Sequence, residues 1–149
     1  MTRRLTITAL LVMASATAVA QGSLEDVRKS HVEANVPARE NFNRLLQRDL
    51  VAFFTARTKR AVKIDYRLLR DGPTQSGTAY PKYYAWVRIL DGSNLVDEGP
   101  VRLAAIERSR FEVSDFISSS TVRSDPSSVE QVFPAALVSG ILASAGARR

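Results

Sequence analysis

The stretch Tyr80–Leu90 reads Tyr-Pro-Lys-Tyr-Tyr-Ala-Trp-Val-Arg-Ile-Leu, and we expect the rest of the chain to be organised around it. It holds the only tryptophan, Trp86, and three of the four tyrosines. Turn-forming residues flank it on both sides, at residues 71–77 and at residues 91–94. Aromatic and β-branched residues bounded by turn residues are typical of a strand. We therefore predict a long central strand over residues 78–90.

Three further strands are expected around this one. Residues 62–69 alternate apolar and polar side chains with a period of two, which is typical of a strand with one buried face. Asp91-Gly92 favours a hairpin turn after the central strand. Residues 95–107 then form a third strand, with an edge position or a bulge at Gly99-Pro100, and residues 111–117 form a fourth. We expect these four antiparallel strands to follow one another as a meander.

A long helix precedes the strands and is expected over residues 37–56. Its apolar residues recur at helical spacing and share one stripe: Phe42, Leu45, Leu46, Leu50, Phe53 and Phe54. Polar and charged residues occupy the opposite face. A stripe with three phenylalanines must be covered, so we expect this helix to pack on the sheet.

The C-terminal region is expected to be helical after a polar linker at residues 118–124. Pro126 suits the first position of a helix. An amphipathic series of apolar residues follows. Pro134 lies inside this series, so we expect a kink or two short helices there. Gly146 is expected to end the last helix.

Together these elements predict a single α+β domain over residues 37–147. A long helix followed by a curled four-stranded meander resembles the cystatin-like arrangement. With helices at both ends it is also similar to the cone-shaped fold of nuclear transport factor 2. The resemblance is one of topology over Pro37–Ile117. The Gln-x-Val-x-Gly loop of cystatins is absent, so no functional residue is carried over, and function does not follow from fold.

The N-terminus has the pattern of a secretory signal peptide. Arg3 and Arg4 form a basic start, Leu5–Val19 is largely apolar, and Ala18-Val19-Ala20 has the small-x-small form of a cleavage site. We therefore expect cleavage after Ala20, which places the mature chain in the periplasm or outside the cell. The apolar stretch is too short for a membrane anchor. Thr6 stands where a twin-arginine signal normally has a bulky apolar residue, which leaves that export route a minor alternative.

Composition narrows the class of protein further. The chain has no cysteine, so it carries neither a lipid-bearing cysteine nor a disulfide, and its stability must come from an apolar core. Loss of Arg3 and Arg4 with the signal leaves 19 basic and 15 acidic residues, a net charge of +4. This excess fits weak attraction to anionic partners but predicts no specific binding of nucleic acid. After cleavage, residues 21–36 form a polar segment with a possible short helix.

The alternation of the strands assigns a different set of residues to each face of the sheet. Apolar residues share the face expected to pack on the long helix: Val62, Ile64, Tyr66, Leu68, Ala85, Val87, Ile89, Val101, Leu103, Ala105, Phe111 and Val113. The other face is mostly basic and aromatic, and its candidate binding residues are Arg67, Lys82, Tyr84, Trp86, Arg88 and Arg102. Exposed rings framed by arginines suit an anionic polymer, a planar ligand or a protein partner. Two ordinary interpretations stay open: a solvated sheet face, or a C-terminal helix that buries Tyr84 and Trp86.

Residues 57–63 form a second basic group, Arg-Thr-Lys-Arg-Ala-Val-Lys. Cations near the C-terminus of a helix complement its dipole, which explains the cluster without a ligand. An anion site is the functional alternative.

The sequence contains no motif for catalysis. It lacks a Gly-x-Ser-x-Gly motif, a phosphate-binding loop and a metal-ligand cluster, and His31 is the only histidine. We therefore assign no catalytic residue, metal or cofactor. Acid–base chemistry by Asp65 with a tyrosine would require a cavity that brings them together.

Three functions remain open on these grounds. The first is an exported binding module that recognises a protein partner or an anionic envelope component through the basic and aromatic sheet face. The second is a small-ligand pocket or an enzyme site between helix and sheet, where Tyr66 and other polar groups converge. The third is a structural or assembly protein that docks by its C-terminal helix.

Overall fold

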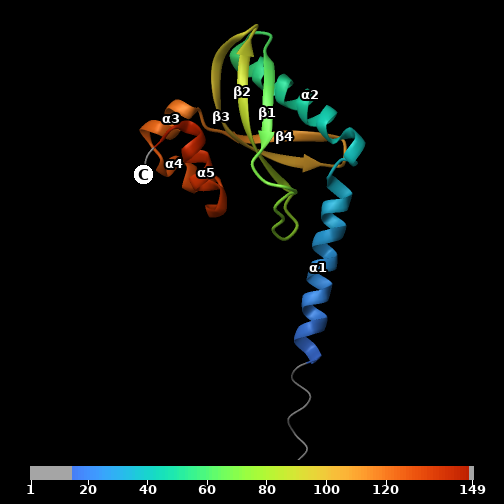
Figure 1. Cartoon of the computed structure of the whole chain (residues 1–149). Helices are drawn as coiled ribbons and strands as arrows, with labels where there is room; N and C mark the ends of the chain where they lie inside the picture. The colour runs from blue at the N-terminus through green and yellow to red at the C-terminus, as the bar shows by residue number, and fades with distance from the viewer. Residues whose placement is uncertain (1–14, 148–149) are drawn as a thin grey trace, which may run out of the picture.

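The computed structural model describes residues 15–147, with side chains from Leu24 onward. Four antiparallel strands form one sheet, with helices on both faces (Figure 1). In chain order the elements are α1 (Ser15–Asn35), α2 (Arg39–Thr58), β1 (Lys63–Leu68), β2 (Lys82–Asp91), β3 (Asn94–Ile106), β4 (Arg110–Phe116), α3 (Ser119–Ser124), α4 (Ser127–Val132) and α5 (Ala135–Ala145).

The sheet is a meander, with strand order β1-β2-β3-β4 and antiparallel pairing throughout. The predicted α+β class, with a long helix on a four-stranded antiparallel sheet, is confirmed. The order of elements is compatible with the cystatin-like or cone-shaped arrangement.

The first apolar layer lies between α2 and the sheet. Leu46, Leu50 and Phe54 of α2 have no exposed area, and neither do Ala85, Val87, Val101, Leu103 and Ala105 of the sheet. The residues predicted to face α2 belong to this cluster, either as buried members or packed against it. The inward set predicted from alternation is therefore confirmed. This layer holds the long helix on the sheet.

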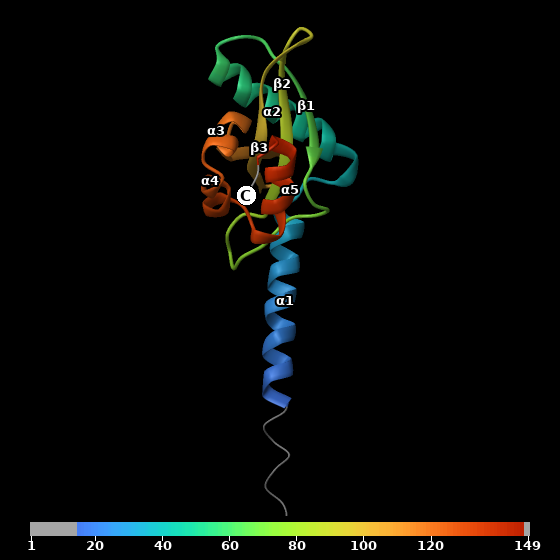
Figure 2. The same cartoon turned by 60° about the vertical axis from the view of Figure 1, so that its left-hand side comes forward.

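A second apolar layer lies on the opposite face, under α3, α4 and α5 (Figure 2). Tyr84 and Trp86 are each only 5% exposed and pack with Val122, Phe133 and Ile141 among other apolar residues of the C-terminal helices. The exposed aromatic pair considered for the sheet face is thus not present. The alternative, in which C-terminal helices bury these two rings, is what the structure shows.

The C-terminal segment is more helical than expected. Residues 118–124 were predicted to be a polar linker, but Ser119–Ser124 form α3. Ser118 caps this helix, since its side chain accepts a hydrogen bond from the Ser120 backbone N–H, and Val122 anchors it with no exposed area. The break predicted at Pro134 is confirmed, because α4 ends at Val132 and α5 begins at Ala135. Gly146 ends α5 in a left-handed conformation, with φ of 70°.

Two strand boundaries differ from the prediction. β2 begins at Lys82 instead of residue 78, because Pro81 has no N–H for the ladder. β3 continues through Gly99 and Pro100, and the register shifts lie instead at Ile89/Leu90 and Arg102/Leu103. Pro100 is tolerated because it lies where pairing with β4 ends. Its carbonyl accepts a hydrogen bond from Ile117 N at 3.2 Å, so its nitrogen faces away from β2.

α1 projects from one end of the domain (Figures 1 and 2). It contains the short helix expected in residues 21–36. The helix begins earlier, at Ser15, and so runs across the expected cleavage site after Ala20. Residues 1–14 of the expected signal peptide lie outside the described part of the chain. Asn35 holds the base of α1, since its Oδ1 accepts from Glu107 N at 3.1 Å and its carbonyl accepts from Arg108 N at 2.8 Å. Among the helices of residues 15–147, none has the length and apolar character needed to cross a bilayer.

Candidate functional site

The outer face of the sheet, which carries the predicted binding residues, is arranged in cross-strand rows. Asp65, Arg88 and Glu98 are neighbours in one row, and Arg67, Trp86 and Pro100 in the next. Tyr84, Arg102 and Asp115 form a third row. Residues that are paired across strands point to the same side of a sheet. The rows therefore decide which of the predicted residues meet.

Two of the predicted arginines attach the C-terminal helices to the sheet. Arg102 Nε donates to Asp115 Oδ2 at 2.7 Å, and its Nη1 donates to the carbonyl of Val132 in α4 at 3.1 Å. Arg67 Nη2 donates to Ser144 Oγ in α5 at 2.6 Å. Charge-assisted hydrogen bonds of this kind are stronger than neutral ones. Arg102 in particular acts as a structural link and is not available to a partner.

Tyr84 and Lys82 lie away from the open part of this face. The Tyr84 hydroxyl is 2.8 Å from Thr74 Oγ1, and its ring lies beside that of Phe133 at 6.0 Å between centroids. Lys82 is half-buried and its backbone pairs with Thr74 at the start of β2. Tyr84 therefore belongs to the covered half of the sheet, and Lys82 lies at the start of β2 beside the β1–β2 loop.

Three of the six predicted residues do meet at one place. Arg67, Trp86 and Arg88 line a cavity of about 170 Å³, together with Asp65 and Tyr66. The cavity lies on the part of the outer face that α5 leaves uncovered. We take it as the candidate site.

Glu98 fixes the charged groups at one side of this cavity. Its Oε2 accepts a hydrogen bond from Trp86 Nε1 at 3.4 Å and lies 3.8 Å from Arg88 Nε. The Arg88 side chain nevertheless keeps half of its surface exposed. The indole is thus held in place, while the guanidinium can still reach a ligand.

Asp65 adds a negative charge to the cavity, next to the positive charges of Arg67 and Arg88. Its carboxylate is 45% exposed and lies 3.4 Å from Lys63 Nζ. The site therefore offers guanidinium donors on two sides and a carboxylate acceptor on a third. A ligand with one anionic group and neighbouring hydroxyl or amide donors matches this arrangement better than a bare anion does.

The space between α2 and the sheet, where the second hypothesis placed a pocket, is filled by the first apolar layer. Tyr66 does not point its hydroxyl into a cavity there, since the hydroxyl donates to Asn43 Oδ1 at 3.2 Å near the surface. Burial of its ring raises the pKa of Tyr66. Among the described residues, the polar groups near Tyr66 gather at the cavity on the outer face, which Tyr66 lines with Asp65 and the two arginines, and not between α2 and the sheet.

The C-terminal helix, which the third hypothesis made a docking element, already uses its apolar side. Val138, Ile141, Leu142 and Ala145 of α5 are buried on the chain's own sheet. Only small residues such as Ser139 and Ala143 face outward.

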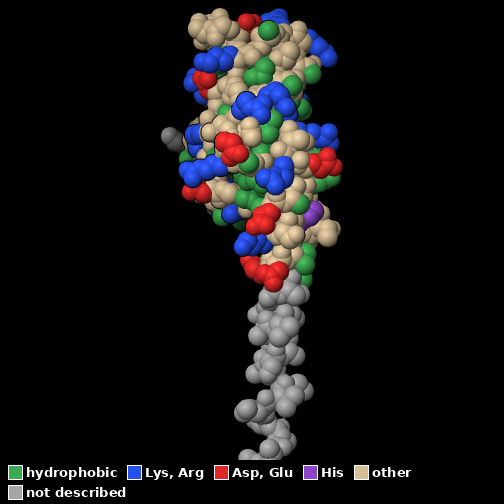
Figure 3. Space-filling model, turned by 90° about the vertical axis from the view of Figure 1, so that its right-hand side faces the viewer, with side chains coloured by type: hydrophobic (Ala, Val, Ile, Leu, Met, Phe, Trp, Pro, Cys, Tyr) green, Lys and Arg blue, Asp and Glu red, His purple; other side chains and the backbone are tan. Residues whose placement is uncertain are grey.

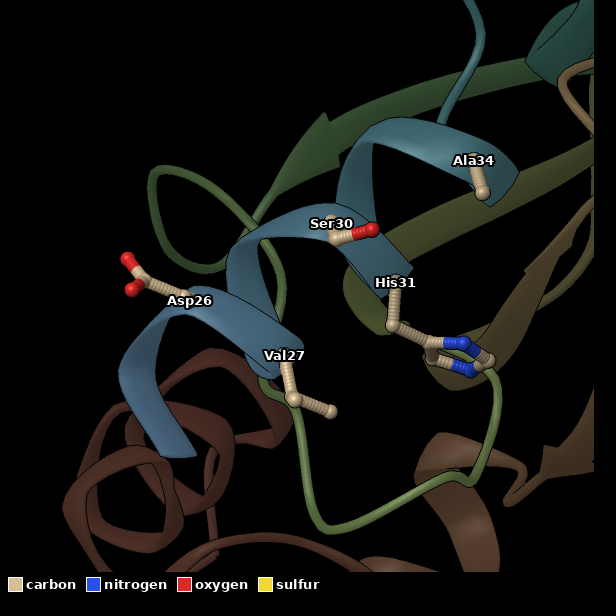
Figure 4. Close-up of a pocket in the computed structure, with 5 residues that line it drawn as sticks. All are labelled: Asp26, Val27, Ser30, His31 and Ala34. Carbon is tan, nitrogen blue, oxygen red and sulfur yellow. The ribbon is translucent and has the colours of Figure 1, made fainter. Parts of the chain in front are cut away.

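A hollow of about 400 Å³ beside α1 was not identified from the sequence (Figure 4). Val27 and His31 project to one side of the helix, and Asp26 points to the other. His31 Nε2 lies 3.1 Å from the carbonyl of Ala79, and the imidazole stacks on Tyr80 at 6.5 Å between centroids. The spacing of Val27, His31 and Ala34 on one helix face was the available signal. All the residues that line the hollow belong to α1.

Other sites for chemistry are not apparent. Within residues 15–147 no group of three histidine, cysteine or carboxylate side chains could hold a metal ion. On the side of the molecule that carries α2 and α1, Lys and Arg are interspersed with Asp and Glu (Figure 3).

Comparisons of the chain with models of protein families, with characterised proteins and with solved structures found no match.

Proposed function

We propose that this chain is an exported binding module that recognises an anionic component of the cell envelope at the cavity beside Trp86. The observation that carries the proposal is the meeting of Arg67, Trp86 and Arg88 around one hollow on the outer face of the sheet. Guanidinium groups match the geometry of carboxylates, and Trp86 lines the hollow beside them.

Export is supported by the N-terminal pattern of Arg3-Arg4, the apolar stretch Leu5–Val19 and the small residues before Gln21. The mature protein would then work in the periplasm or outside the cell. Mass spectrometry of the exported chain should give a mature N-terminus at Gln21. An intact N-terminus on the exported protein would contradict this part of the proposal.

The size of the cavity limits what enters it. At about 170 Å³ it is smaller than the ~300–1,000 Å³ of sites that enclose a whole ligand. It therefore accepts one ring or one residue of a larger molecule. A sugar acid fits the chemistry, because Arg88 would bind its carboxylate and Asp65 would accept hydrogen bonds from its hydroxyl groups.

The single tryptophan supplies the test. We expect glucuronate to change the Trp86 emission of the exported protein in a saturable way, whereas glucose should not. Arg88→Gln should weaken binding about tenfold or more, because a charge-assisted hydrogen bond is worth about 1.5–3 kcal/mol. Arg110→Gln removes another exposed cation, from a strand that does not line the cavity, and should bind as the wild type does.

Two results would count against the proposal. Equal responses to glucuronate and glucose, or equal losses in the Arg88 and Arg110 variants, would mean that the cavity does not select an anion. An acidic peptide titrated in the same way tests the other source of a carboxylate. If only the peptide binds, the partner is a protein and not an envelope sugar.

A further inference from the structure

A second surface, at the end of the domain opposite α1, carries exposed cations. Arg57, Lys59, Arg60 and Lys63 lie between the end of α2 and the start of β1, and all four are exposed. We call these four residues, together with Leu95 and Val96, the cationic tip.

Leu95 and Val96 add an apolar component to this surface. They are the second and third residues of β3, directly after the β2–β3 turn and Asn94, and they are 47% and 51% exposed. Single exposed apolar residues are ordinary. Two adjacent ones beside a group of cations are a combination that a peripheral membrane surface uses.

Contacts between elements bring the two halves of the tip together. Arg60 Nη1 lies 3.9 Å from Asp91 Oδ2 in the β2–β3 turn. Lys63 pairs with Leu90, which pairs in turn with Leu95, so these three residues form a row across the sheet. Both cartoon views place the end of α2 and the β2–β3 turn at one end of the molecule, with α1 at the other (Figures 1 and 2).

The tip retains positive charge after its own acidic residues are counted. Asp91 lies beside Arg60 and Asp65 beside Lys63, which leaves Arg57 and Lys59 in excess. The Arg57 guanidinium lies over the Phe116 ring at 5.4 Å from its centroid, which holds it in place. Asp97 lies beside Leu95 and Val96 and accepts hydrogen bonds only from the neutral donors Glu98 N and Ser118 Oγ, so counting its charge reduces the excess at the tip from two cations to one.

Lys59 occupies the C-terminal capping position of α2, where a lysine is an unusual residue. It ends α2 in the left-handed conformation, with φ of 57°, where glycine or asparagine is normally found. A lysine accepts some backbone strain at this position. It also places an exposed ammonium group in the connection between α2 and β1.

We propose that the cationic tip docks on the surface of an anionic lipid bilayer. The four cations would approach lipid phosphates, and Leu95 and Val96 would enter the boundary between headgroups and acyl chains. A few cations beside an anionic surface give weak attraction that salt screens. The docking is therefore reversible and sensitive to ionic strength. Lys63 of the tip contacts Asp65 of the cavity beside Trp86, so the charge variants below leave Lys63 unchanged.

Co-sedimentation with vesicles tests the proposal on the protein purified as the cell exports it. We expect binding at low salt to vesicles of equimolar phosphatidylglycerol and phosphatidylcholine, and none to vesicles of phosphatidylcholine alone. Lys59→Asn with Arg60→Gln should weaken binding roughly 25-fold, at about fivefold for each charge removed. Asparagine suits the left-handed position, so this variant should fold.

The matched control removes the same number of charges from the opposite end. Arg28→Gln with Lys29→Gln on α1 should leave vesicle binding within about twofold of the wild type, because these residues lie beyond a Debye length from the docked surface. Leu95→Thr with Val96→Thr should weaken binding roughly tenfold while keeping strand propensity.

The overturning results are equally specific. No binding of the wild type to the anionic vesicles would end the proposal. Equal losses in the tip and α1 charge variants would mean that net charge alone attracts the protein, which also overturns a docking tip. Wild-type affinity in the Leu95 and Val96 variant would rule out insertion of the β2–β3 turn.

Discussion

Gly99 is the residue at which the backbone leaves no room for a side chain. A Cβ placed there would overlap the carbonyl oxygen of Ile117, where the chain leaves β4 and turns into α3. The glycine therefore permits a close backbone crossing, and positive φ has no part in it. This crossing brings α3 against β3 and starts the layer of C-terminal helices.

We predict that Gly99→Ala lowers the free energy of unfolding by about 1–3 kcal/mol or more, because backbone must move to admit the methyl group. Gly140→Ala is the matched control. A Cβ there meets no atom within 4 Å, and alanine favours the helix α5 by about 1 kcal/mol. Urea unfolding of both variants measures the difference. Equal effects on stability would show that the crossing at Ile117 is not rigid.

At the scale of elements, β2 serves two apolar layers at once. Tyr83, Ala85 and Val87 face α2, while Tyr84 and Trp86 face the C-terminal helices, and all five are buried. A strand covered on both faces loses the polar alternation of a solvated strand. The short run from Tyr83 to Val87 shows this pattern.

Side chains bind one backbone group on each edge strand of the sheet. Gln47 Nε2 donates to the carbonyl of Ile64 in β1 at 2.9 Å, and Asp49 Oδ2 accepts from Phe111 N in β4 at 2.6 Å. Asp97 Oδ1 accepts from Glu98 N at 2.8 Å on the part of β3 that extends past β4. Occupied edge groups discourage pairing with another chain. We therefore expect recognition to use side chains instead of an added strand.

The layer of C-terminal helices should contribute to stability through Ile141, which has no exposed area. We predict that Ile141→Ala lowers the free energy of unfolding by about 2–5 kcal/mol. The exposed Ser139→Ala in the same helix should change it by less than about 0.5 kcal/mol. Urea unfolding followed by Trp86 fluorescence measures both. An Ile141 variant as stable as the Ser139 variant would mean that α5 is only loosely attached.

At the scale of the whole molecule, stability comes from packing on both sides of one sheet. The sequence has no cysteine, so no disulfide contributes. Burial makes the charged forms of Tyr66 and Tyr83 unfavourable and raises the pKa of each in the folded state. The unfolded chain titrates its tyrosines near pH ~10. It releases these protons before the folded chain does.

Stability should therefore be fully present below about pH 10 and should fall as the pH rises through the folded-state pKa of Tyr83. We predict that Tyr83→Phe reduces this alkaline loss, measured as the free energy of unfolding in urea at a series of pH values. Tyr80→Phe leaves Tyr83 in place and should keep the wild-type decline. A decline that is unchanged in Tyr83→Phe would assign the alkaline sensitivity to other groups.

Local sequence patterns predicted most of the helices and strands, because the spacing of apolar residues within an element depends only on residues near one another in the chain. Helical spacing from Phe42 to Phe54 identified α2, and a period of two identified the inward residues of the sheet. For the candidate site, Arg67, Trp86 and Arg88 were selected from the sequence and do line one cavity. Lys82, Tyr84 and Arg102 were selected on the same grounds but do not line it. Alternation assigns a residue to a face but does not show what covers that face.

The sequence alone thus determined the α+β class, the order of the strands and the residues that pack under α2. These follow from hydrophobic periodicity and turn chemistry, which act over a few residues. Only the tertiary structure decided whether the outer face of the stretch Tyr80–Leu90 is exposed or buried. The C-terminal helices return across its outer face, and Arg67 and Arg102 hold them there through Ser144 and Val132. An arginine whose guanidinium group bonds to a hydroxyl or carbonyl far along the chain can have the same sequence neighbours as an arginine that is exposed to water. The sequence therefore could not distinguish the two.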